Sequence, residues 1–271
     1  MRDPKEQKIV VLTELIESDK NIILNGIKLA GIFNKELCLL HSVSKGKKSN
    51  YLRADDALFG YKSILKKDIP QLPVSILILE GTLDKLIDPL TDEYEAILVV
   101  ASATSYKKLA KTVRESSIPF LFINNHSEVI STYKKIIIPI DLRRENSDVA
   151  LWCSYFGRFN YSEIIAIVAT DKGKDNIKRI TKNILGLKKL LSKFKIPHKI
   201  YKGKKNSFGI QHEALDLAKT TQSDLYITLG SSLITPIDKL IGLPEAKVLR
   251  NAGDLPILII NPRKDMYILC D

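Results

Sequence analysis

The organisation of this chain follows from a short apolar run that it contains twice: Lys8-Ile-Val-Val-Leu-Thr-Glu14 near its start and Lys135-Ile-Ile-Ile-Pro-Ile-Asp141 near its middle. Both runs are rich in β-branched residues and end at an acidic residue, and both precede a helix-like stretch and a second apolar run. The distance between the copies is far longer than the roughly 20–50 residues of a solenoid repeat. The pattern therefore predicts a duplicated domain.

Apolar runs alternate with helical patterns throughout the second copy. The stretch 175–193, for example, carries isoleucines and leucines at the spacing of one helix face. Asn146 or Ser147 is expected to cap the first helix of this copy. The alternation predicts strands at 134–140, 163–170, 197–201, 224–229 and 255–260, and helices at 146–159, 175–193, 207–220 and 244–251.

The first copy predicts the same order of elements with one loss. The segment 81–92, which Pro89 interrupts, stands where the second copy has its third helix. Strands that alternate with helices form a parallel sheet covered on both faces. We therefore expect an α/β chain of two tandem doubly wound, Rossmann-like domains, 1–130 and 131–271. In the first, strands are expected at 8–13, 36–43, 73–79, 95–101 and 118–123, and helices at 19–33, 51–67 and 105–115.

Composition places the chain among globular proteins, with 45% hydrophobic residues and a net charge of +11 over 271 residues. No apolar stretch reaches the roughly 18 residues of a membrane span, and the first residues lack the apolar core of a signal peptide, so we expect a cytoplasmic protein. The lysines are spread through both halves without an RNA-binding motif, which does not favour nucleic acid as a partner. Cys38, Cys153 and Cys270 fit neither a metal site nor a redox pair, and the first two are expected to be buried.

Four places in the second half resemble the universal stress protein family. They are the strand ending at Pro139-Ile-Asp141, the helix start Ser147-Asp-Val-Ala-Leu151, the run Ala218-Lys-Thr-Thr-Gln-Ser-Asp224-Leu-Tyr-Ile, and the stretch from Gly230-Ser-Ser232 through Gly242-Leu243 to Leu255-Pro-Ile-Leu-Ile-Ile260. The first half is similar at 8–43 and 118–123. The resemblance covers most of the chain and implies a tandem member of the family, with two domains of the adenine nucleotide alpha hydrolase-like type.

ATP-binding members of that family hold the phosphates in a glycine-rich loop after the fourth strand, because glycines let backbone N–H groups turn toward phosphate oxygens. This chain keeps Gly230 and Gly242, but Leu233 replaces the middle glycine and the span is one residue shorter than in the family. Leu243 stands where a hydroxyl would meet a phosphate. The loop is therefore an altered version of the family's.

The resemblance implies a weak site for an adenine nucleotide, ATP or AMP, in the second domain. Asp141 fits the adenine position, and the backbone from Ile167 to Thr170 would read the base. Two structural alternatives stay open: Asp141 equally fits a carboxylate that caps the helix start or a turn, and Gly230 equally fits a tight strand exit. The candidate residues are Asp141, Ile167, Val168, Gly230, Ser231, Ser232 and Gly242.

The first domain has Glu14 at the position of Asp141 but lacks the loop, because Ala101-Ser-Ala-Thr-Ser-Tyr106 leads directly into a helix. We expect this domain to bind no ATP. Domains of this family commonly pair through their last strands, so the resemblance implies a built-in partner for the second domain. The segment 264–271 could form an edge strand that joins two copies into a homodimer.

The sequence contains no nucleophile elbow, Walker motif or metal-ligand spacing, so we expect no catalytic residues, no metal and no enzyme activity. The resemblance implies a stress-response regulatory or sensor protein that responds to an adenine nucleotide and signals to an unknown protein partner. The alternative is a nucleotide-free interaction scaffold built from two vestigial domains. Asp141, Gly230 and Gly242 favour the first interpretation, whereas Leu233 and Leu243 favour the second.

Overall fold

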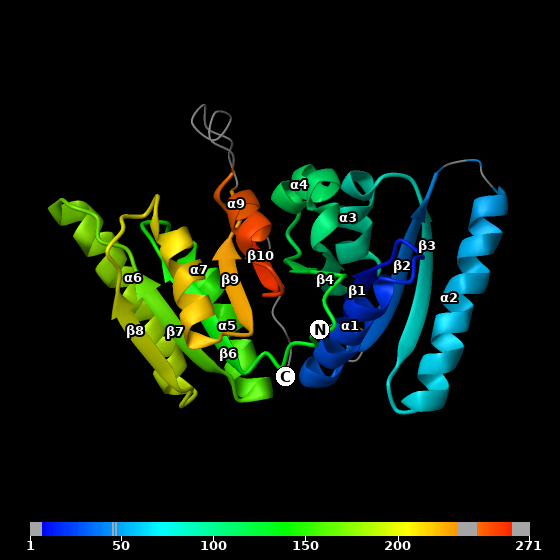
Figure 1. The fold of residues 1–271 in the computed structure, drawn as a ribbon, viewed down its shortest axis with the longest axis horizontal. Coiled ribbons are helices and arrows are strands. Elements are labelled where there is room, and N and C mark those ends of the chain that lie inside the picture. Colours follow the sequence, from blue (N-terminus) through cyan, green and yellow to red (C-terminus); the bar gives the residue numbers. More distant parts are fainter. Residues whose placement is uncertain (1–6, 45, 47, 232–242, 262–271) are drawn as a thin grey trace. The chain divides into compact units, whose positions relative to one another are not determined.

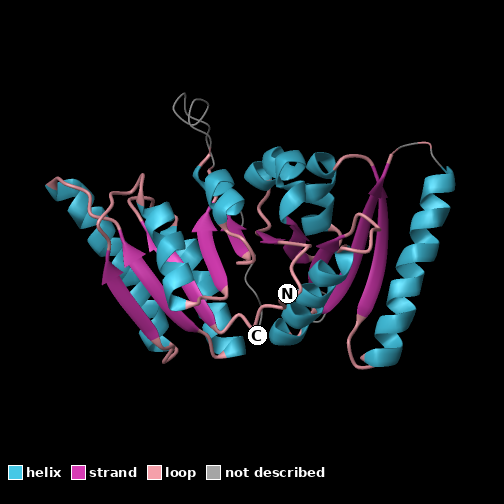
Figure 2. Cartoon of the chain, in the orientation of Figure 1, coloured by secondary structure: helices cyan, strands magenta, loops and turns pink. Residues whose placement is uncertain are grey.

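The structure is a computed structural model that describes residues 7–44, 46, 48–231 and 243–261. The described residues form two compact units that meet in the sequence between Ile130 and Ser131. Each unit is a parallel sheet with helices packed against it (Figures 1 and 2). The α/β class and the two tandem doubly wound sheets predicted from the sequence are confirmed.

The first unit alternates strands and helices along the chain. β1 pairs in parallel with both β2 and β4, so the strand order within this unit is β3-β2-β1-β4-β5. All seven residues of β4 are buried, as expected for an inner strand covered on both faces. The elements are β1 (Lys8–Leu12), α1 (Asp19–Phe33), β2 (Glu36–Val43), α2 (Lys48–Asp68), β3 (Val74–Glu80), α3 (Leu83–Asp92), β4 (Ala96–Ser102), the short 3-10 helix η2 (Ala103–Ser105), α4 (Tyr106–Glu115) and β5 (Phe120–Ile123).

The second unit repeats this winding. β6 pairs in parallel with β7 and β9, and the strand order within the unit is β10-β9-β6-β7-β8. The chain therefore reverses its direction across the sheet between β6 and β9, at the topological switch point. The elements are β6 (Lys135–Ile140), α5 (Asn146–Asn160), β7 (Glu163–Val168), α6 (Lys174–Lys193), β8 (His198–Lys202), α7 (Ile210–Thr221), β9 (Leu225–Leu229), α9 (Pro244–Asn251) and β10 (Ile257–Ile260).

α3 differs from the interrupted segment that the sequence predicts, because it runs through Pro89 as one helix. Proline removes one N–H donor, but the turn around it is held by other bonds. Oγ1 of Thr91 donates to the carbonyl of Ile87 at 3.1 Å, and the N–H of Glu93 donates to the carbonyl of Pro89 at 2.9 Å. Buried Leu90 adds an apolar contact surface, so packing outweighs the local cost of the proline.

Asp224 joins the beginnings of the two strands that flank the switch point. Its Oδ1 and Oδ2 accept hydrogen bonds from the N–H groups of Lys135 and Lys134 at 2.9 and 3.0 Å. Its own N–H donates to the carbonyl of Lys135 at 2.9 Å. The aspartate that resembles a family motif is thus a clamp between β9 and β6, far from the strand ends that would bind a ligand.

Candidate functional site

The carboxyl ends of β6 and β9 lie side by side at the switch point of the second unit, where open α/β sheets place their ligands. Asp141 follows β6 directly and is only 3% exposed. Gly230 and Ser231 follow β9, and Val168 ends the neighbouring strand β7. The structure therefore brings these candidates to one end of the sheet. Ser232 and Gly242 lie outside the described residues.

Both carboxylate oxygens of Asp141 are occupied by internal donors. Oδ1 accepts from the backbone N–H of Arg143 at 2.9 Å and from Nδ2 of Asn146 at 3.0 Å. Oδ2 accepts from Nε and Nη2 of Arg143 at 2.9 and 2.6 Å. Asp141 thus closes a turn with the residue two positions later, which is the turn alternative left open by the sequence.

Neither Asn146 nor Ser147 caps α5, contrary to the expectation from sequence. The N-cap residue is Glu145, and no side chain makes a cap hydrogen bond there. The amide of Asn146 instead donates back to Asp141 and to the carbonyl of Arg143. The polar residues at this helix start therefore stabilise the strand exit.

Arg143 spans the switch point. Besides its ion pair with Asp141, its Nη1 donates to the carbonyl of Leu229 at the end of β9, at 3.4 Å. The guanidinium therefore lies across the crevice between β6 and β9, with 36% of its side chain exposed. Sequence reasoning missed this residue. The signal was an arginine two positions after the candidate aspartate, the spacing at which a side chain can fold back on a turn.

The backbone at the end of β7, expected to read an adenine base, is already hydrogen-bonded within the protein. The N–H groups of Ala169 and Thr170 donate to main-chain carbonyls at 2.9 and 2.8 Å, and the carbonyl of Val168 accepts an N–H at 2.8 Å. Ile167 and Val168 are buried. A base would have to displace an existing bond to use these N–H groups.

Gly230 is required by a close approach of the chain. A Cβ atom built on this residue would lie 2.2 Å from Oδ1 of Asn261, directly after β10, and 3.0 Å from Cγ2 of Ile259 within β10. Its N–H donates to the carbonyl of Ile260 at 2.8 Å. Packing alone therefore accounts for this glycine, in line with the strand-exit alternative.

Ser231 gives both of its donors to a buried carboxylate. Its N–H and its hydroxyl donate to Oε1 and Oε2 of Glu245 at 3.0 and 2.8 Å. Glu245 is buried in the first turn of α9, the positive end of the helix. The carboxylate thus uses the type of helix end that commonly binds a phosphate, and sequence reasoning missed it.

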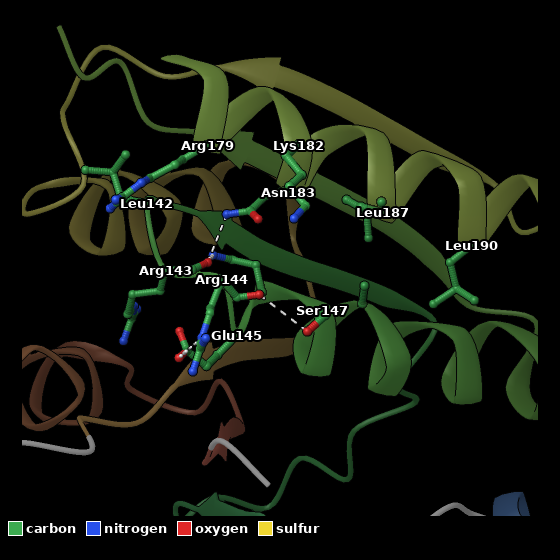
Figure 3. A pocket seen from close by; sticks show the side chains of 13 residues that line it. Leu142, Arg143, Arg144, Glu145, Ser147, Arg179, Lys182, Asn183, Leu187 and Leu190 are labelled. Carbon is green, nitrogen blue, oxygen red and sulfur yellow. Dashed lines mark hydrogen bonds and ion pairs between the residues drawn. The ribbon is translucent and has the colours of Figure 1, made fainter. Parts of the chain in front are cut away.

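A groove lies next to the β6–α5 turn, between α5 and α6 (Figure 3). Its volume is about 940 Å³. Nδ2 of Asn183 fastens α6 to the turn by donating to the carbonyls of Asp141 and Arg143, both at 2.9 Å. Within the described residues the cations of α6 in this groove have no ion-pair partner. The charged residues that line the groove are Arg143, Arg144, Glu145, Arg179 and Lys182.

The matching strand exit of the first unit is built differently. Oε1 of Glu14, after β1, accepts from the hydroxyl of Ser105 at 2.7 Å, and β4 leads directly into η2 and α4. Oδ2 of the fully buried Asp19 accepts from three N–H groups, those of Glu14, Leu15 and Ile16. Burial raises the pKa of Asp19 even though these hydrogen bonds favour its charged form.

Other reactive groups offer no second site in the part of the chain that the structure describes. Cys38 and Cys153 are buried, and burial raises the pKa of Cys38 to about 11. Burial also raises the pKa of Cys153. No group of acidic, histidine or cysteine side chains among the described residues could hold a metal ion. None of the described helices is long and apolar enough to cross a membrane.

Comparison with known proteins extends these observations to the fold only. No family model and no curated protein matches the chain. A universal stress protein from Archaeoglobus fulgidus DSM 4304 superimposes with a TM-score of 0.66 at 12% identity, over 97% of this chain and 100% of that one. A putative universal stress protein from Pseudomonas aeruginosa UCBPP-PA14 gives 0.61 at 13% identity, over 94% and 93%.

A third solved structure, a universal stress protein in complex with cAMP, matches 44% of this chain and 97% of its own at 19% identity. Its TM-score of 0.35 is too low to transfer a ligand position. The chain therefore shares the fold of universal stress proteins along nearly its whole length. The chemistry of its site has to be argued from its own residues.

Proposed function

We propose that the chain is a non-enzymatic regulatory protein of the universal stress protein type, a tandem member whose second unit binds an adenine nucleotide at its switch point. The observation that carries the proposal is the pair of Asp141 and Arg143. Asp141 supplies a carboxylate where the sheet offers a ligand crevice, and Arg143 covers it with a side chain that is partly exposed.

In this proposal Arg143 is an internal competitor of the nucleotide. Binding requires its guanidinium to leave Asp141 and the carbonyl of Leu229, which costs charge-assisted hydrogen bonds. The nucleotide then binds weakly, because part of the interaction energy replaces these bonds. Once displaced, the guanidinium and the neighbouring cations Arg144, Arg179 and Lys182 provide a positive field for the phosphates.

The test is calorimetric titration with ATP, AMP and a cyclic nucleotide. Wild-type protein is expected to bind weakly and Asp141→Ala not at all. Arg143→Ala removes the competitor and is expected to bind adenosine about tenfold more tightly than wild type does. Adenosine is used because it has no phosphate, so the variant loses no contact between Arg143 and a phosphate. Ser192→Ala, an exposed change in the last turn of α6 that does not line the groove between α5 and α6, serves as the matched control and should behave as wild type.

A second candidate function is a nucleotide-free interaction scaffold. The observation that favours it is that Ser231 and the end of β7 give their donors to the protein itself, to Glu245 and to main-chain carbonyls. This candidate predicts that neither wild type nor Arg143→Ala binds any of the nucleotides or adenosine. That result, obtained on folded and ligand-free protein, would replace the sensor proposal with the scaffold.

The absence of enzyme activity is part of the proposal. It is supported by the described carboxylates of the site, which already accept hydrogen bonds from the protein and are not free to take a proton from a substrate. Asp141 and Glu245 are both engaged by donors. Phosphate release from ATP is expected to match a buffer blank. Release above the blank that disappears in Asp141→Ala would contradict this part.

A further inference from the structure

The helix that follows the second strand packs differently in the two units. In the first unit, α2 packs on the edge strand β3 and on β2. In the second unit, the corresponding helix α6 packs chiefly on α5, and β8 is not among the elements that it contacts closely. Figure 1 shows α2 running alongside β3. The edge strand of the second unit is thus covered less closely by its helix than its duplicate is.

The space left beside β8 is a groove of about 1020 Å³ between α6 and the ends of β7 and β8. Its floor is apolar and comes from both sides, with isoleucines on α6 and an isoleucine and a tyrosine on β8. Ile177 and Tyr201 are 55% and 45% exposed. The apolar floor residues are Ile177, Ile180, Ile184, Ile200 and Tyr201.

This groove corrects the sequence-based view of α6 as a helix with one core-facing stripe. Leu187 and Leu191 of the predicted stripe are buried, but Ile177 is exposed and Ile184 is only half-buried. The helix therefore carries more apolar surface than it buries among the described residues. Part of this excess, at Ile177 and Ile184, faces the groove.

The rim of the groove is positively charged. It carries the ammonium groups of Lys172, Lys188, Lys202 and Lys204, and within the described residues none of these is ion-paired. The acidic side chain in the lining, Asp171, uses Oδ2 to accept from the N–H and the hydroxyl of Ser207 at 2.9 and 2.6 Å. The groove thus combines an apolar floor with an excess of positive charge, because four lysines and one aspartate line it.

We propose that this groove binds a small anionic amphiphile, a molecule with an aliphatic body and a carboxylate or phosphate head. The isoleucine floor and the apolar stems of the lysines would cover the body, while the ammonium groups bind the head. The volume is close to the upper end of the range for small-molecule pockets, roughly 300–1,000 Å³. The groove shares Val168 with the candidate nucleotide residues, but Asp141, Gly230 and Ser231 do not line it, so it extends from the end of β7 away from the switch point.

The ligand class is tested by displacement of the fluorescent anion 8-anilinonaphthalene-1-sulfonate from the full-length protein. Dodecanoate and dodecyl phosphate, both below their micelle-forming concentrations, are the two anionic arms and show which head the lysines prefer. Dodecyltrimethylammonium carries the same chain with the opposite charge. It is expected to bind at least about tenfold more weakly than either anion, because like charges meet at the rim.

The location is tested with matched pairs on α6. Ile177→Glu places a charge on the floor, whereas Leu185→Glu makes the same change at a residue that is 60% exposed and does not line the groove. Lys188→Glu reverses a rim charge, whereas Lys189→Glu reverses the charge of its exposed neighbour outside the groove. The groove variants are expected to weaken both anions about tenfold, and the controls to leave them unchanged.

Because all four positions are exposed or at the rim, the variants should fold, and circular dichroism verifies this. Three results would overturn the proposal. They are no saturable displacement by either anion, equal binding of the cationic amphiphile, and equal weakening by the groove variants and their controls.

Discussion

Nη2 of Arg143 lies 2.6 Å from Oδ2 of Asp141, so the carboxylate at the switch point of the second unit is neutralised by a cation two residues away. Removing one partner of such a pair leaves a charge of the wrong sign without compensation. Asp141 is buried, while Arg143 is partly exposed, so water can replace some of the lost interaction.

Arg143→Ala is therefore expected to lower the free energy of unfolding by about 2 kcal/mol, less than for a fully buried pair. Urea denaturation measures this. Arg144→Ala is the control, since its side chain is 95% exposed, and it should change stability by no more than about 0.5 kcal/mol. If Arg143→Ala were as stable as wild type, the pair would not hold the strand exit.

Glu245 is expected to be a stability residue. Glu245→Ala leaves the N–H and the hydroxyl of Ser231 without their acceptor and should lower the free energy of unfolding by about 1–3 kcal/mol. Ser231→Ala removes only the hydroxyl and should cost less. In the double variant the two effects should not add, because the residues share one interaction. Additive costs would show that the bond to Glu245 contributes little.

Gly230 and Gly186 make a matched pair for the close approach at the end of β9. A Cβ at Gly230 would meet Asn261 at 2.2 Å, whereas a Cβ at Gly186 of α6 meets nothing within 4 Å. Gly230→Ala is therefore expected to destabilise by about 1–3 kcal/mol. Gly186→Ala should stabilise by roughly 0.5–1 kcal/mol, because alanine favours a helix. Thermal denaturation measures the stability of both variants. If Gly230→Ala were no less stable than Gly186→Ala, the close contact with Asn261 would be able to relax.

Asp19 is expected to make the stability of the protein depend on pH. Its pKa is raised by burial, so the folded state binds more protons than the unfolded state above the ordinary value of 3.8. Stability contributed by this group is present below pH 3.8 and is lost as pH rises through the raised pKa.

The measurement compares wild type with Asp19→Asn by urea denaturation at several pH values. Wild type should lose stability relative to the variant as pH rises, and the difference should become constant above the pKa of Asp19. Asp175→Asn, at an exposed aspartate of α6, provides the background slope. A difference that grew in the opposite direction would mean that the three N–H bonds outweigh burial.

The fold was predictable because the periodic patterns of apolar residues in the sequence mark its strands and helices. Every described strand of both sheets overlaps its predicted range, since buried parallel strands are continuous apolar runs and the runs are separated by helical patterns. Among the helices, α3 differs from the prediction, because Pro89 suggested an interruption there. Its helix persists with Leu90 buried and with hydrogen bonds from Thr91 and Glu93, and burial depends on the tertiary fold, which no local pattern contains.

The candidate site was less predictable. The positions of Asp141 and Gly230 at two strand ends followed from the strand order, because carboxyl ends of parallel strands share one edge. The side chains that bind at those strand ends did not follow from the strand order. Arg143 reaches Leu229 across the sheet, and Glu245 reaches Ser231 from the next helix. Such pairs depend on how the elements pack against one another. The resemblance to a family pointed to residues that could bind a ligand, but it did not point to the side chains that occupy the crevice.

The clamp by Asp224 has a consequence for synthesis on the ribosome. Asp224 and Lys135 are separated by 89 positions, yet their bonds align the central strand pair of the second unit. At roughly 5–20 residues per second, β6 leaves the ribosome several seconds before β9 can join it. During that interval one edge of β6 has no neighbour, so its unpaired N–H and C=O groups are open to pairing with another chain.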